Sequence, residues 1–145
     1  MDAKAFARAL RIMTPERLYV VGGCVLWPDD RPPTEAHVQE ALAQRRANYA
    51  AFTRPDRLDA RARAAYEHDF NRRFLIRDLG WAGVDESWTP ADLASCAEHW
   101  AAILRDALRR QMPDRAFEVE VIGADAADDE PLEVCVTFTQ AWSAT

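Results

Sequence analysis

The stretch that decides the fold class is Phe117-Glu118-Val119-Glu120-Val121, followed after one loop by Leu132-Glu133-Val134-Cys135-Val136-Thr137-Phe138. In both segments apolar residues alternate with polar ones, as in a β-strand with one buried and one solvent-exposed face. We therefore expect an antiparallel hairpin over residues 116–139, with Cys135 and Thr137 on the exposed face. The side chains expected to face the core are Phe117, Val119, Val121, Val134, Val136 and Phe138.

Helical patterns occupy most of the chain before this hairpin. Thr89-Pro90-Ala91-Asp92 supplies an N-cap threonine, a proline at the first helical position and an acid at the third, which together are typical of a helix start. The spacing of apolar residues and of capping signals predicts helices over residues 3–13, 34–52, 56–79 and 89–111.

The apolar run from Leu18 to Trp27 has the composition of a buried strand and contains Gly22-Gly23. The glycine pair fits either a bulge within one central strand, which we favour, or the tight turn of a very short hairpin. The resulting order is α-β-α-α-α-β-β. We expect one α+β domain over residues 1–145, in which a small, mainly antiparallel sheet of about three strands packs against helices.

The acidic residues are concentrated at one end of the chain. The formal net charge is −6, but residues 114–145 hold eight acids against one base, Arg115, a net charge of −7. Residues 45–77 hold nine arginines against four acids, a net charge of +5. These charges indicate either two solvated faces or a surface that docks a partner. The acids taken as candidate binding residues are Glu118, Glu120, Asp125, Asp128, Asp129, Glu130 and Glu133.

Several classes of protein are disfavoured by the composition. Net acidity argues against general nucleic-acid binding, and the longest apolar run has ten residues, where a membrane-spanning helix needs about 20. The three cysteines, at positions 24, 96 and 135, have no metal-ligand spacing and favour a reducing compartment. No signal-peptide pattern occurs at the start. Arginine outnumbers lysine by 17 to 1, and we expect a cytoplasmic bacterial protein.

No catalytic or cofactor motif is present, so we expect no catalytic residues, cofactor or metal. Cys96 and His99 share a helix face, but the second half of a metal site is missing. We interpret them as a core cysteine and a boundary histidine. Glu67, His68 and Asp69 are consecutive on the predicted helix and point in different directions. We interpret these three as a solvated face.

Arg45 lies in the middle of an apolar stripe on the predicted helix 34–52. A charge on such a face is costly unless it is paired or reaches solvent. If helices 34–52 and 56–79 form an antiparallel hairpin, Glu67 or Asp69 comes within reach. We expect Arg45 to be largely buried and paired with one of these carboxylates, so that Arg45→Ala lowers the melting temperature. The alternative is that Arg45 binds an anionic ligand or the carboxylate of a partner.

Two groups of aromatic residues suggest further contacts. Trp81 and Trp88 bracket a loop and either pin it to the core or form a binding hot spot. The predicted helix 56–79 carries a second apolar stripe, which indicates either a central helix or an interface, including a homodimer. This stripe consists of Tyr66, Phe70 and Phe74.

The leading hypothesis is a non-enzymatic protein that binds another, basic protein through the acidic hairpin. Small acidic domains of this class include immunity proteins that neutralise basic toxins, and secretion chaperones, whose strands lie in the centre of the chain. The alternative is a small enzyme or ligand-binding domain, for which a sizeable cleft with convergent polar groups would be the mark. Its pocket, between sheet and helices, would be lined by Tyr19, Trp27, Arg45, Tyr66, His99 and Trp100.

Overall fold

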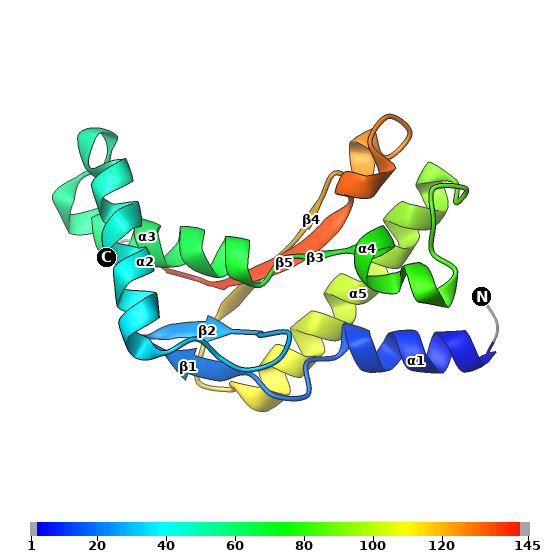
Figure 1. Ribbon diagram of the computed structural model, residues 1–145, viewed down its shortest axis with the longest axis horizontal. Coiled ribbons are helices and arrows are strands. Elements are labelled where there is room, and N and C mark those ends of the chain that lie inside the picture. The colour runs from blue at the N-terminus through cyan, green and yellow to red at the C-terminus, as the bar shows by residue number, and fades with distance from the viewer. Residues whose placement is uncertain (1–2, 143–145) are drawn as a thin grey trace. The chain divides into compact units, whose positions relative to one another are not determined.

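The computed structural model describes residues 3–142 of the chain (Figure 1). It confirms the α+β class, with helices and two small antiparallel sheets. The chain divides into two compact units, the first of residues 1–16, 72–114 and 119–137, and the second of residues 17–71, 115–118 and 138–145. Strands β4 (Phe117–Ile122) and β5 (Cys135–Gln140) contribute residues to both units. A single domain over residues 1–145 stays a prediction.

The first unit is organised on the long helix α5, which is confirmed over its predicted length. It begins after Thr89, whose Oγ1 accepts a hydrogen bond from the Asp92 backbone N–H (3.1 Å), and ends at Gln111. Its buried Trp100 donates from Nε1 to the carbonyl of Met13 (2.9 Å). The other elements of this unit, besides parts of β4 and β5, are α1 (Ala3–Met13), β3 (Arg73–Phe74), α4 (Leu75–Leu79) and α5 (Pro90–Gln111), with 3-10 turns η2 (Gly80–Ala82), η3 (Ala124–Ala126) and η4 (Pro131–Glu133).

The expected alternation holds in β4 but not in β5. Along β4, exposed Glu118 and Glu120 alternate with half-buried apolar residues, as predicted. In β5, Cys135 and Thr137 are buried as well as Val136 and Phe138, so the expected exposed face of this strand was wrong. The strand order is β3-β5-β4, and β5 is therefore a central strand with neighbours on both edges. The third strand of this sheet, β3, arises inside the segment predicted as helix 56–79.

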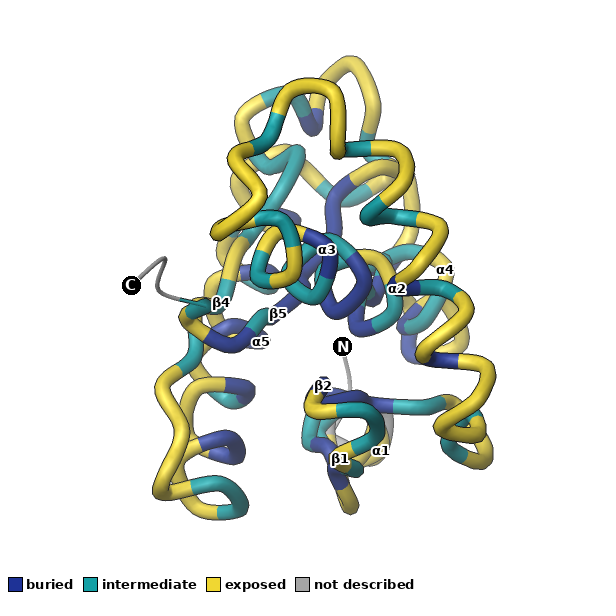
Figure 2. The backbone as a smooth tube through the Cα atoms, turned by 90° about the vertical axis from the view of Figure 1, so that its left-hand side faces the viewer, coloured by how far each residue is buried: buried dark blue, intermediate teal, exposed yellow. Residues whose placement is uncertain are grey.

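The second unit is a helical hairpin packed on a separate two-stranded sheet. Helix α2 (Glu35–Tyr49) starts after the predicted cap Thr34 and passes through η1 (Ala50–Phe52) into α3 (Pro55–Phe70). Figure 2 shows buried and exposed stretches alternating along these helices, as expected for helices with one face on a core. The core residues of this unit are Cys24, Leu26, Val38, Leu42, Ala62 and Tyr66.

Gly22 and Gly23 form a tight turn, which corrects the preference for one bulged strand. Strands β1 (Tyr19–Val21) and β2 (Cys24–Leu26) pair antiparallel, with Val21 opposite Cys24. The φ angles of the two glycines are +58° and +82°. Positive φ at both central residues is the requirement of a type I′ hairpin turn, and glycine meets it without steric cost. Residues 18–27 therefore form a separate hairpin and contribute no strand to the three-stranded sheet.

The predicted helix 56–79 is broken at Asn71, and the reason is tertiary. The buried Asn71 side chain accepts from the Trp27 backbone N–H (2.8 Å) and donates to the carbonyls of Val25 (3.0 Å) and Phe138 (3.2 Å). A side chain that satisfies strand backbones in this way competes with continuation of a helix. Phe74 therefore lies on β3, and no continuous helical stripe joins it to Tyr66 and Phe70.

None of the helices in the described residues combines the length and the apolar character that crossing a lipid bilayer requires.

Candidate functional site

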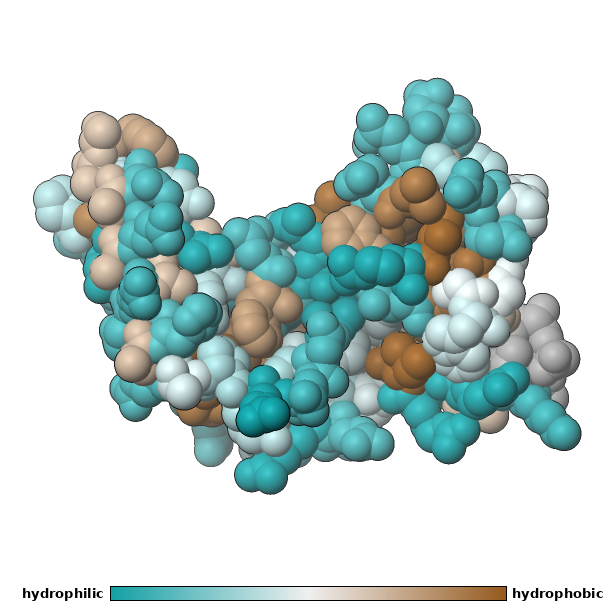
Figure 3. Space-filling view, in the orientation of Figure 1, coloured by the Kyte–Doolittle hydropathy of each residue, from teal (hydrophilic) through white to brown (hydrophobic). Residues whose placement is uncertain are grey.

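The acidic candidates on β4 and the loop that follows are all exposed. We call the acidic surface the six of them that belong to the first unit; Glu118, also exposed, belongs to the second unit. In Figure 3 the end of the loop between β4 and β5 is covered by hydrophilic side chains. The structure thus presents these carboxylates to solvent, as an interaction surface requires. The acidic surface consists of Glu120, Asp125, Asp128, Asp129, Glu130 and Glu133.

The loop that carries these acids is held by its backbone and by one small buried side chain. Gly123 opens it with a φ of +81°, and a Cβ there would lie 3.0 Å from the Glu133 carbonyl oxygen. The Glu130 backbone N–H bonds to the Ala126 carbonyl (2.9 Å). Ala127 is buried, and η3 packs against α5. A glycine turn and a buried alanine thus anchor the loop while its carboxylates point outward.

In the described part of the chain, most acids of the acidic surface lack the ion pairs that several other acids form. Asp59, Asp69 and Asp106 each form an ion pair with an arginine at 2.9–3.3 Å. Among residues 3–142, no ion pair joins a cation to any of five acids of the acidic surface. Their negative charge is therefore not neutralised by neighbouring arginines of the same unit. These five are Asp125, Asp128, Asp129, Glu130 and Glu133.

The two candidate tryptophans occupy different environments. Trp81 is 46% exposed, donates from Nε1 to the Asp78 carbonyl (3.1 Å) and has the Arg8 guanidinium 5.2 Å from its ring centroid. Trp88 is half-buried and lines a cavity of the first unit. Trp81 is thus not pinned in the core, and its ring remains a candidate contact.

Arg45 forms the predicted ion pair, with Asp69 rather than Glu67 as its partner. Its Nη2 lies 3.2 Å from Asp69 Oδ2, and its side chain is 24% exposed against 55% for that of Asp69. Its guanidinium also lies 5.1 Å from the ring centroid of Tyr66. The Arg45 side chain is therefore mostly covered and paired with a carboxylate of the predicted helix, as expected, but the Asp69 end of the pair is open to solvent.

Removing this exposed pair is expected to have a small effect. Asp69→Asn should lower the free energy of unfolding by less than about 1 kcal/mol, because exposed ion pairs contribute little. Arg45→Ala should cost about 1–2 kcal/mol, since it also removes the contact with the Tyr66 ring and the packing of the stem. Urea denaturation of both variants measures the difference. A loss of about 4 kcal/mol for Arg45→Ala would mean that the pair behaves as a buried one.

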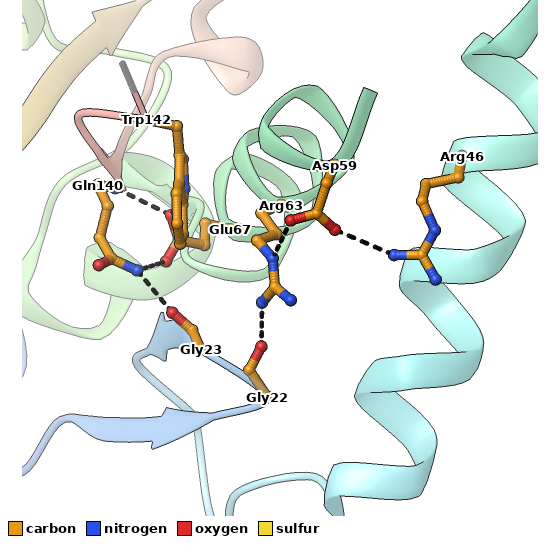
Figure 4. Close-up of polar contacts among 8 residues, drawn as sticks. All are labelled: Gly22, Gly23, Arg46, Asp59, Arg63, Glu67, Gln140 and Trp142. Carbon is orange, nitrogen blue, oxygen red and sulfur yellow. Dashed lines mark hydrogen bonds and ion pairs between the residues drawn. The ribbon is translucent and has the colours of Figure 1, made fainter. Parts of the chain in front are cut away.

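Glu67, the other predicted partner of Arg45, is instead fully buried at the centre of a polar network (Figure 4). Its Oε2 accepts from the Val25 backbone N–H and from Gln140 Nε2, both at 2.7 Å. Its Oε1 accepts from the Gln140 backbone N–H (2.9 Å) and from Trp142 Nε1 (2.6 Å). The interpretation of Glu67 as part of a solvated face was therefore wrong. Each of the two carboxylate oxygens accepts two hydrogen bonds from groups of the same chain. The carboxylate is therefore a structural acceptor rather than a binding group.

A second chain of polar contacts runs from the glycine turn to α2. Arg63 donates to the Gly22 carbonyl and, from Nε, to Asp59 Oδ2 (2.9 Å), and Asp59 Oδ1 accepts from Arg46 (3.3 Å). Cys24 lies near Arg63 of this chain of contacts, and burial together with the nearby Glu67 carboxylate raises the pKa of its thiol to about 11. The Cys24 thiol thus stays protonated near neutral pH and is no nucleophile.

The first unit also contains a cavity of about 660 Å³. Of the six residues predicted to line a pocket, only His99 lies in it; Trp100 is fully buried in the first unit, and Tyr66 and Trp27 are buried in the second. Cys96 and His99 share the cavity, but burial raises the pKa of the Cys96 thiol, so the pair is not an activated thiolate. The lining residues are Ala9, Met13, Leu79, Trp88, Asp92, Ser95, Cys96 and His99.

Within residues 3–142, no three histidine, cysteine, aspartate or glutamate side chains gather in a way that could hold a metal ion.

Comparison of the chain with protein-family models, with curated proteins and with solved structures finds no match.

Proposed function

We propose that this chain is a non-enzymatic binding protein that captures a basic protein partner through the acidic surface. The observation that carries the proposal is a run of five exposed carboxylates in one loop that form no ion pair within the described residues. They are Asp125, Asp128, Asp129, Glu130 and Glu133. Some exposed acids elsewhere in the chain, such as Asp59, Asp69 and Asp106, do pair with arginines. An unmatched surface of one sign attracts a partner of the opposite sign and steers its approach.

The loop geometry supports the same function. Gly123 and Ala127 anchor the loop, so its carboxylates are held in place before a partner arrives, and less conformational entropy is lost on binding. Exposed Trp81 is a further candidate contact in the same unit, because tryptophan is enriched at binding hot spots. A role like that of an immunity protein, which neutralises a basic toxin, fits this chemistry better than that of a secretion chaperone.

The test neutralises the loop and measures the rate of association. The variant Asp128→Asn, Asp129→Asn, Glu130→Gln removes three exposed charges without changing the core. A partner isolated from the source cell with the wild-type chain should associate with this variant about tenfold more slowly at low salt. The difference should shrink as salt rises, because the Debye length at physiological ionic strength is only about 8 Å. Stopped-flow mixing at two salt concentrations provides the rates.

The matched control removes three exposed acids outside the acidic surface: Asp30→Asn, Glu40→Gln, Glu86→Gln. This control changes net charge by the same amount, so it separates a local docking surface from a general effect of charge. Equal rates for the loop variant and the wild type at low salt would show that the acidic surface only keeps the protein in solution. Equal slowing of both variants would show that no particular surface docks the partner.

A further inference from the structure

The cavity of the first unit has an apolar floor and a polar mouth. Ala9, Met13 and Leu79 are 2%, 3% and 0% exposed and form the buried part of its lining. The polar part comes from α5, where Asp92, Ser95 and His99 are exposed. Because positions 92, 95 and 99 recur at spacings of three and four, their side chains lie along one face of the helix. A ligand in this cavity would meet an apolar surface at one end and a row of polar groups at the other.

The charge of this lining is negative. Asp92 is the acid among the described lining residues, and these include neither arginine nor lysine. Within the described residues, the Asp92 carboxylate forms no ion pair with an arginine or lysine. The half-buried indole of Trp88 also lines the cavity, and the face of an indole attracts cations. Both features favour a positively charged head group.

The size of the cavity suits a small organic molecule. Ligand pockets are typically about 300–1,000 Å³ and combine apolar walls with a few polar groups that orient the ligand. At about 660 Å³, this cavity accommodates one aromatic ring with a short chain. We propose that it binds a small organic amine, with the aryl or alkyl part over Met13 and Leu79 and the ammonium group between Asp92 and Trp88. This binding site is independent of the acidic surface and of its protein partner.

Three probe molecules of the same shape and different charge test this proposal. The probes are 2-phenylethylamine, 2-phenylethanol and 3-phenylpropionate, and their dissociation constants are measured by titration calorimetry. The amine should bind several-fold more tightly than the alcohol, and the carboxylate should bind least tightly, because the Asp92 carboxylate attracts an ammonium group and repels a second carboxylate. Absence of binding by the amine at millimolar concentration, or a preference for the carboxylate, would overturn the proposal.

Variants on the exposed face of α5 locate the binding site. Asp92→Asn should weaken binding of the amine several-fold and leave binding of the alcohol unchanged. Glu98→Gln removes a charge from an exposed position of the same helix that does not line the cavity, and it should bind like the wild type. Ser95→Trp should fill the mouth from an exposed position and abolish binding of both probes. If Asp92→Asn binds the amine like the wild type, the carboxylate is not the recognition group.

Cys96 provides a readout at the cavity itself. Cys24 and Cys135 are buried, at 0% and 2% exposure, whereas Cys96 is half-buried and lines the cavity. Iodoacetamide should therefore alkylate Cys96 before the other two cysteines in the folded protein. Saturating 2-phenylethylamine should slow this alkylation several-fold, and peptide mass mapping identifies the modified residue. Heat of binding without protection of Cys96 would place the amine elsewhere and contradict the proposal.

Discussion

Glu67→Ala is expected to destabilise the second unit by about 3–5 kcal/mol, because it leaves several buried donors without an acceptor. The Glu67 carboxylate is fully buried and accepts four hydrogen bonds, two of them from the backbone N–H groups of Val25 and Gln140. The other two come from the side chains of Gln140 and Trp142. Truncation of Glu67 to alanine removes both acceptor oxygens at once and leaves a cavity. Relaxation of the surrounding side chains recovers only part of the lost free energy of unfolding. Chemical denaturation provides the free energy of unfolding.

Two further variants separate charge from shape at this position. Glu67→Gln preserves the shape but presents an NH₂ group to donors, and we expect it to cost about 1–3 kcal/mol. Asp69→Asn changes an exposed carboxylate two residues further along the same helix and serves as the control for loss of charge. If Glu67→Ala costs no more than Asp69→Asn, the network of Figure 4 contributes little to stability.

Features determined by neighbouring residues were predictable from the sequence. The N-caps Thr34 and Thr89 both accept the expected hydrogen bond from the residue three positions later. Each cap satisfies a helical N–H group that lacks an intrahelical partner, so its signal is local. The alternation in β4 was equally readable, because acids at every second position cannot be buried cheaply.

Features that depend on residues distant in the sequence were not predictable. Asn71 ends α3 because its side chain bonds the backbones of β2, β5 and the residue after β2. The sequence of residues 66–76 does not indicate these partners, and its apolar residues keep a helical spacing through the position where the helix ends. The burial of Glu67 was unpredictable for the same reason, because its carboxylate oxygens accept hydrogen bonds from residues 42–75 positions away in the sequence. The glycine pair, in contrast, carried a local signal for a hairpin, because both central residues of a type I′ turn need a positive φ.

The candidate site was predictable only in part, for the same reason. The acidic residues are exposed as the sequence suggested, because charges remain in water unless they are paired. The cavity combines residues of α1, α4 and α5 with Trp88, and its lining cannot be assembled without the packing of three helices. Among the residues predicted to line a pocket, His99 was the correct one, because its position at the edge of the apolar stripe of α5 already indicated a boundary between core and solvent.

Trp100→Ala is expected to be nearly as damaging to the first unit as Glu67→Ala is to the second, at about 3–5 kcal/mol. Trp100 is fully buried in α5, and its Nε1 donates to the carbonyl of Met13 at the end of α1. That carbonyl is one of the last in its helix and has no partner from the helix ladder. Trp100 therefore contributes both apolar burial and the hydrogen bond that terminates α1.

Trp100→Phe divides these two contributions. Phenylalanine keeps most of the apolar area but cannot donate a hydrogen bond, so the Met13 carbonyl loses its donor at a cost of about 1–3 kcal/mol. If packing dominates, the phenylalanine variant stays close to the wild type and the alanine variant does not. If the hydrogen bond dominates, the two variants lose similar free energies of unfolding. Because burial of a side chain of this size outweighs a single neutral hydrogen bond, we expect thermal and urea denaturation to place Trp100→Phe nearer to the wild type than to Trp100→Ala.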